Sequence, residues 1–143
     1  MAEFEVSSMD ELIRAMQDFD LFTDDVQDKL ISAGADTLMA TIREEAQRSG
    51  QDLQRITGKL TKGRVLKKDK NGNRYRVVSI PGNNSRGERN GTVAFVLNYG
   101  RSEEYGRIEG SYFWTRAVKR TENSLLPIYE KIINEELTER SLI

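Results

Sequence analysis

The chain of 143 residues contains no cysteine and no histidine. Without cysteine it can form no disulfide, no thiolate metal site and no cysteine nucleophile. Without histidine it lacks the commonest general base and the commonest metal ligand. These two absences argue against an enzyme or a metalloprotein, and we predict no catalytic residue, no metal site and no cofactor.

Long hydrophobic runs are also missing. No stretch approaches the roughly 20 apolar residues that a membrane span requires. The first twelve residues, MAEFEVSSMDEL, lack the basic and apolar regions of a signal peptide. We therefore expect a soluble protein of a reducing cytoplasm, with no membrane partner, folded as a single domain. Its expected parts are N-terminal helices (1–50), a segment of connector, basic hairpin, loop and strand (51–100), and a joint with a C-terminal helix (101–143).

Charge is nearly balanced, at a net −1, but it is unevenly placed. Residues 1–30 hold nine acids and two bases, whereas residues 59–76 hold eight bases and one acid. Such asymmetry is typical of electrostatic pairing with another copy or another partner. The alternative is that the solvent face of a hairpin simply needs charge.

Two helices are predicted at the start of the chain. Ser8 and Glu11 have the spacing of a capping box before an apolar-periodic run, which predicts a short helix ending near Asp20. Thr23 offers a second N-cap to a longer helix, and Gly50 offers its stop.

Strand patterns follow. The dipeptide Asn71-Gly72 lies between β-prone runs at 64–68 and 74–80, which predicts a hairpin. Residues 81–91 carry no apolar side chain beyond the ring of Pro81, so we expect an exposed, mobile loop. The next run, Thr92 to Leu97, is apolar enough to predict a third strand buried on both faces.

A long helical pattern runs from about Tyr112 to Leu137. Because Pro127 removes one helical hydrogen bond, we expect a kink near Asn123 or a break with Ser124 capping a second helix. The fold class predicted from this order is α+β, with an antiparallel sheet of about three to four strands, helices packed on one face and a long, kinked C-terminal helix.

The basic hairpin is the first candidate site. Cations along a β-ribbon can contact a nucleic-acid backbone, although edge strands also use lysine to prevent aggregation. A small nucleic-acid-binding protein is therefore the alternative function. The hairpin candidates are Lys62, Arg64, Lys67, Lys68, Lys70, Arg74 and Arg76.

Three segments together resemble a known family. They are Thr57-Gly58-Lys59-Leu60, the run from Ala94 to Ser102 (AFVLNYGRS), and the run from Ser111 to Ala117 (SYFWTRA). Over residues 24 to 138 the chain resembles the minor tail and tail-completion proteins of long-tailed bacteriophages, to which the lambda tail protein Z group is related.

The chain departs from that family pattern at a few positions. Asn98 replaces an acid, Arg101 separates Gly100 from Ser102, and the last helix begins without the usual proline steps around residues 112–117.

The resemblance implies a structural virion protein of the neck or head–tail connector. Copies would form a ring, a hexamer or a dodecamer, around the channel through which genomic DNA passes. Its neighbours would be head-closure or connector proteins and tail-tube or tail-terminator proteins. The location would be the virion, and the host cytoplasm during assembly. In one hypothesis the acidic N-terminal region of one subunit faces the basic hairpin of the next, and in the other the hairpin lines the DNA channel.

Within this expectation, three further sets of residues receive roles. The exposed loop becomes a docking arm that orders on contact, with Asn83, Asn84, Arg86, Glu88 and Arg89 as its candidates. The joint before the last helix becomes a subunit contact, with Arg101, Glu103, Glu104, Tyr105 and Arg107 as its candidates. The predicted structural anchors are Phe95, Tyr99, Gly100, Phe113 and Trp114.

Overall fold

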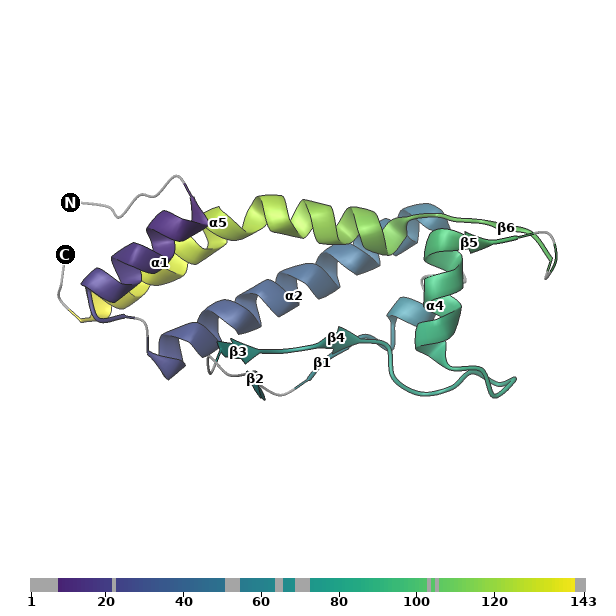
Figure 1. Ribbon diagram of the computed structural model, residues 1–143, viewed down its shortest axis with the longest axis horizontal. Helices are drawn as coiled ribbons and strands as arrows, with labels where there is room; N and C mark the ends of the chain where they lie inside the picture. The colour runs from purple at the N-terminus through teal and green to yellow at the C-terminus, as the bar shows by residue number, and fades with distance from the viewer. Residues whose placement is uncertain are drawn as a thin grey trace. The chain divides into compact units, whose positions relative to one another are not determined.

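The structure is a computed structural model that describes residues 8–21, 23–50, 55–63, 66–68, 73–102, 104 and 106–140. Figure 1 shows the order of its elements along the chain. The helices are α1 (Met9–Asp18), α2 (Asp24–Ser49), α4 (Asn90–Tyr99) and α5 (Phe113–Glu139). The strands are β1 (Thr61–Lys62), β2 (Leu66–Lys68), β3 (Asn73–Tyr75), β4 (Val78–Ser79), β5 (Gly100–Arg101) and β6 (Ile108–Glu109).

The strands form three antiparallel pairs, β1 with β4, β2 with β3, and β5 with β6. Mixed helix and strand, antiparallel pairing and a long C-terminal helix are thus confirmed. The predicted sheet of three to four strands is not seen in the described part of the chain, because each pair stops at two strands.

The described residues group into two compact units. The first unit draws on residues 1–34, 65–76 and 122–143, and the second on residues 35–64 and 77–121. Helices α2 and α5 each contribute to both units. The single-domain organisation of the chain stays a prediction.

The first unit has its own apolar cluster. Leu12 and Met16 of α1 pack with Leu30 of α2 and with Ile133 and Leu137 of α5. In Figure 1, α1 accordingly lies against the C-terminal end of α5. Burying apolar side chains at one helical face is what holds a short helix such as α1 in place.

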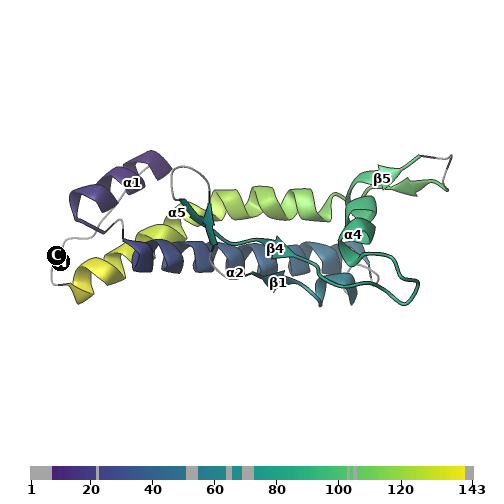
Figure 2. The ribbon, with the colours of Figure 1, turned by 60° about the horizontal axis from the view of Figure 1, so that its bottom comes forward.

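A second cluster organises the second unit. Its buried side chains come from α2, the helical segment at 55–57, the β1–β4 region, α4 and the start of α5. Figure 2 shows the β1–β4 pair running along α2. The fully or nearly buried members are Ile42, Ala46, Ile56, Leu60, Ile80, Ala94, Phe113 and Ala117.

The predicted helix ends are confirmed. The Ser8 hydroxyl accepts a hydrogen bond from the Glu11 backbone N–H at 3.2 Å, and the Thr23 hydroxyl accepts one from the Val26 N–H at 3.3 Å. Helix α2 ends at Ser49, and Gly50 follows with a φ of +137°, a conformation that glycine adopts readily.

The basic hairpin is also confirmed. Strands β2 and β3 pair with Lys67 opposite Arg74 and Leu66 opposite Tyr75. The turn dipeptide Asn71-Gly72 lies outside the described residues. The second predicted strand, 74–80, divides into β3 and β4, and β4 pairs with β1.

The third predicted strand, Thr92 to Leu97, is wrong because these residues lie within helix α4. Asn90, Ala94 and Asn98 are buried at intervals of four residues, which is a helical period. Valine, threonine and phenylalanine favour strands, but that preference is weak and packing overrides it. Because the run is apolar almost throughout, its periodicity could not distinguish helix from strand.

Of the two alternatives predicted at Pro127, the break is wrong, and the kink stays a prediction. Helix α5 runs without interruption from Phe113 to Glu139, with Pro127 inside it. Proline has no N–H, so the carbonyl of Asn123 lacks its usual helical donor. Packing of the residues on both sides of Pro127, such as Ala117 and Ile133, keeps the helix continuous.

Within the described residues, none of the helices combines the length and the apolar character needed to cross a membrane.

Gly34 of α2 provides a test of packing in the first unit. A Cβ added there would lie 2.8 Å from the Tyr129 hydroxyl oxygen. Alanine is favoured over glycine inside a helix by about 1 kcal/mol, and the collision with the hydroxyl opposes that gain. We expect G34A to leave the free energy of unfolding unchanged or lower it, whereas G34A added to Y129F raises it by about 1 kcal/mol. Urea unfolding of the four chains checks this, and an equal gain in both backgrounds would contradict the contact.

Candidate functional site

Arg74 of the basic hairpin is bound within its own chain. Its Nη2 donates to Asp28 Oδ2 at 2.8 Å, and its Nη1 lies 3.6 Å from Asp24 Oδ2. The Arg74 side chain is only 16% exposed. The hydrogen bond from Arg74 holds the pKa of Asp28 below its ordinary value. Acids of the N-terminal region and a base of the hairpin therefore meet inside one molecule.

The other hairpin candidates have different surroundings. Lys62 Nζ donates to Asp36 Oδ1 at 2.7 Å, and Arg76 is half-buried. Lys67 and Lys68 lie in β2, where only the backbone is described. Arg64 and Lys70 lie outside the described residues.

The loop before α4 is exposed, as predicted, but it has hydrogen bonds of its own. Asn84 Oδ1 accepts hydrogen bonds from the N–H groups of Arg86 and Glu88, both at 2.9 Å. The backbones of Asn83 and Arg89 pair in an isolated antiparallel β-bridge. These bonds give the loop internal structure, and its role as a docking arm stays a prediction.

A groove of about 720 Å³ lies in the second unit, and part of this loop forms one wall. The lining combines four cations and one acid with apolar side chains. The charged lining residues are Arg55, Lys59, Arg86, Glu88 and Arg101. The apolar lining residues are Ile56, Val93, Val96, Leu97 and Ile108. The groove thus combines two of the predicted sets, the docking loop and the joint.

The candidate residues of the joint have separate contacts and do not form one cluster among the described residues. Arg101 Nε donates to the Gly106 carbonyl at 2.7 Å, which orients its guanidinium group. Arg107 lies 3.8 Å from Glu109 in an exposed ion pair of little strength. Glu104 is exposed, and Glu103 and Tyr105 lie outside the described residues.

Two of the predicted anchors are surface residues instead. Phe113 is fully buried, as predicted, and the half-buried ring of Trp114 lies edge-on to it at 6.3 Å between centroids. Phe95 and Tyr99, however, are 62% and 53% exposed. The helix α4 that replaces the predicted strand presents both rings to solvent.

Phe95 and Tyr99 form an aromatic patch with Tyr112, which is 49% exposed. The ring centroids of Phe95 and Tyr99 are 4.7 Å apart, and those of Tyr99 and Tyr112 are 6.4 Å apart. Such ring pairs attract each other through offset and edge-to-face contacts. A cluster of three large rings exposed to solvent is typical of a binding surface.

The backbone holds Tyr112 in this patch under strain. Its φ is +56°, a left-handed conformation that disfavours a bulky residue by on the order of 1 kcal/mol. The Tyr112 N–H donates to the Asn98 carbonyl, and the N–H and hydroxyl of Ser111 both donate to the Leu97 carbonyl. These bonds to the end of α4 stabilise the strained conformation.

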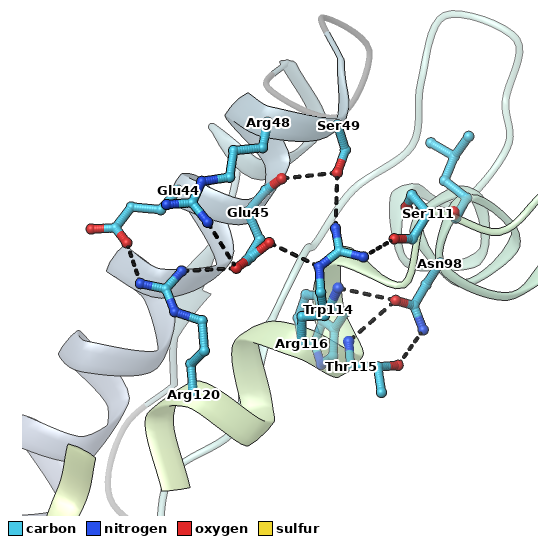
Figure 3. A network of polar contacts seen from close by, with 11 residues as sticks. Glu44, Glu45, Arg48, Ser49, Asn98, Ser111, Trp114, Thr115, Arg116 and Arg120 are labelled. Carbon is cyan, nitrogen blue, oxygen red and sulfur yellow. Dashed lines mark hydrogen bonds and ion pairs between the residues drawn. The ribbon is translucent and has the colours of Figure 1, made fainter. Parts of the chain in front are cut away.

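Asn98 caps α5 from outside that helix (Figure 3). Its Oδ1 accepts hydrogen bonds from the N–H groups of Trp114 at 3.0 Å and Thr115 at 3.2 Å. Its Nδ2 donates to the Thr115 hydroxyl at 2.9 Å. Asn98 therefore takes the part of an N-cap residue, although it belongs to α4.

A buried carboxylate supports the same region (Figure 3). The Glu45 side chain is 3% exposed and accepts hydrogen bonds from Arg116 Nε at 3.0 Å and Arg120 Nη1 at 2.8 Å. Burial raises the pKa of Glu45, but the bonds from the two arginines outweigh it, so the pKa lies below its ordinary value. Arg116 also donates to the Ser111 carbonyl. The network thereby joins α2 and α5 to the segment that carries Tyr112.

Several residues that shape this surface were not predicted from sequence. Arg55 and Lys59 are four residues apart, a spacing that could have marked one helical face. In the sequence, Asn98 is only a departure from the pattern of the family that the chain resembles. Among the described residues, no group of three acidic side chains is placed to hold a metal ion.

Asn98 and its cap give a second testable prediction. N98A leaves two helix N–H groups without an acceptor, so we expect it to lower the free energy of unfolding by about 2 kcal/mol. N98D keeps the acceptor at a helix N-terminus, which favours negative charge, so its loss should be less than half as large. Trp114 fluorescence during urea unfolding reports the difference. Equal losses in the two variants would show that the cap has no energetic role.

Glu45 gives a third prediction, with Glu44 as its control. E45Q leaves two arginines facing a neutral amide, and because both arginines are partly exposed we expect a loss of about 2 kcal/mol at pH 7. Glu44, whose side chain is 57% exposed, accepts from the same Arg120, so E44Q should have a much smaller effect.

The pH dependence has a definite sign. A carboxylate whose pKa is lowered by folding stabilises the protein above its ordinary pKa of 4.5 and loses that effect as pH falls. The difference between wild type and E45Q should therefore shrink as pH falls below about 4.5. A difference that stays constant down to pH 3 would contradict a charge effect.

No protein-family model matches the chain, and neither a curated protein nor a solved structure matches it.

Proposed function

We propose that the chain is a structural subunit of the neck or tail-completion region of a long-tailed phage. In this role it assembles into a ring, a hexamer or a dodecamer, between head-closure or connector proteins and tail-tube or tail-terminator proteins, and surrounds the passing DNA. The proposal rests on the family resemblance of residues 57–60, 94–102 and 111–117. The aromatic patch of Phe95, Tyr99 and Tyr112 is the structural observation that carries it.

The composition of the patch favours contact with protein. Tyrosine and other aromatic residues are enriched at the energetic centres of interfaces, where a few side chains supply most of the binding energy. Here the three rings already contact one another, and hydrogen bonds to α4 hold Tyr112 in a strained conformation. Strain of this kind is common where a side chain is positioned for function.

Ion pairs within the chain make the hairpin a weaker candidate for the subunit contact. Arg74 already bonds Asp28, and Lys62 already bonds Asp36, all within one chain. These pairs reduce the positive charge that the hairpin offers to another copy. The cationic groove and the aromatic patch, both built on α4, take over as the proposed contact surface.

Nucleic-acid binding is kept as a second candidate because of the groove. Four cations line the groove, and helix α4, which also lines it, carries the exposed rings of Phe95 and Tyr99. Cations that follow a backbone, together with rings that stack on bases, are how proteins bind single strands without sequence preference. Such binding weakens steeply as salt concentration rises.

Serine substitutions in the patch test the proposed function. Because truncating one ring at an interface centre typically weakens binding by about 2 kcal/mol, F95S combined with Y99S should raise the concentration needed for assembly at least tenfold. V77S is the control, since Val77 is 50% exposed in the same unit but lies outside the patch.

Light scattering over a range of concentrations and electron microscopy of the particles supply the measurements. Rings in the wild type and in V77S, lost in the double variant, would support the proposal. A wild-type monomer at every concentration, with an affinity for DNA that falls steeply with salt, would instead favour the nucleic-acid candidate.

A further inference from the structure

The groove in the second unit has the chemistry of a peptide-binding site. Its volume of about 720 Å³ is in the range of sites that bind small ligands. Val93, Val96 and Leu97 of α4 supply apolar side chains to its lining. Lys59, Arg86 and Arg101 are among the four cations at its walls. An occupant should therefore be apolar on one side and acidic on the other.

The walls are shaped in advance. Asn84 Oδ1 accepts hydrogen bonds from the backbone of Arg86 and of Glu88, which fixes the loop that carries them. Arg101 is oriented by its bond to the Gly106 carbonyl. A site that is already ordered loses less conformational entropy when a ligand binds.

One segment of this chain has the matching pattern. The sequence Glu3-Phe4-Glu5-Val6 alternates acidic and apolar residues. Bound as an extended strand, it would direct both acids to one side and both apolar side chains to the other. Other acids of the N-terminal region, Asp24 and Asp28, already bond Arg74.

Helix α4 connects the groove to the aromatic patch. Val96 lines the groove, while its neighbours in the helix, Phe95 and Tyr99, are exposed in the patch. A second copy held at the patch would therefore have the groove within its contact area. A contact between two different surfaces of identical subunits is heterologous, and it closes into a ring when the rotation permits.

We propose that the groove binds residues 3–6 of a second copy of this chain. Phe4 and Val6 contact the apolar lining residues of α4, and Glu3 and Glu5 pair with the cations of the lining. This inference rests on the proposed ring and names the segment that links one subunit to the next.

Disulfide trapping tests the contact without background, because the chain has no cysteine of its own. One preparation carries V6C, and a second of different mass carries V96C in the groove. After mixing and oxidation we expect most of the protein to form a covalent heterodimer. V77C replaces V96C as the control, and its yield should be at least fivefold lower, because Val77 is exposed outside the groove.

Charge reversal tests the recognition itself. Adding E3K and E5K to the V6C chain should lower the heterodimer yield about tenfold. Adding R86E and R101E to the V96C chain should lower it similarly, and combining the two reversed chains should restore most of it. Circular dichroism of each variant shows whether it is folded, and restoration by the combination cannot arise from misfolding.

The outcomes separate this inference from the proposed function. Rings without the V6C–V96C heterodimer would overturn the inference and leave the ring standing. A crosslink that forms only inside a chain carrying both cysteines would show that the segment binds its own groove, which also overturns it. Polydeoxythymidine binding that depends on Arg86 and Arg101, with no heterodimer, would assign the groove to nucleic acid. A monomer that gives no heterodimer at any concentration would overturn both the inference and the ring.

Discussion

The candidate surface depends first on the side-chain amide of Asn98. A helix that begins after a sharp turn exposes N–H groups that need acceptors. In α5, Oδ1 of Asn98 accepts hydrogen bonds from two of these N–H groups. The bond fixes the start of α5 to the end of α4. Tyr112 lies between these two points, so its left-handed backbone and its place beside Tyr99 both follow from the junction. An aromatic patch on α4 is thus maintained by a polar contact beneath it.

The arginines of the chain make two kinds of contact. Some arginines stabilise the fold, because Arg116 and Arg120 compensate the buried carboxylate of Glu45, and Arg74 bonds Asp28. Others, with Arg86 and Arg101 as examples, line the groove. Sequence counts treat all of them alike, since net charge carries no information about which partners lie within reach.

Features set by a few neighbouring residues could be predicted from the sequence. The caps at Ser8 and Thr23 and the stop at Gly50 are local chemistry, and the structure has all three. Helix α4 could not be predicted, because its run is apolar almost throughout and only packing around Ala94 decides its conformation. The groove was equally beyond reach, since it forms where segments distant in sequence come together around Arg55. Because Phe95 lies in the run predicted to be a buried strand, its exposure could not be predicted either.

The close approach at the base of the β5–β6 hairpin has a consequence for how this protein can vary. A Cβ on Gly100 would lie 2.5 Å from the Ile108 carbonyl oxygen, and one on Gly110 would lie 2.7 Å from that of Asn98. Neither position has room for a side chain, so both residues at the base of the hairpin must remain glycine. Within the connection between β5 and β6, Gly106 has a φ of +84°, a conformation that also favours glycine. Any side chain at Gly100 or Gly110 would displace the base of the hairpin, and with it the neighbouring rings of Tyr99 and Tyr112.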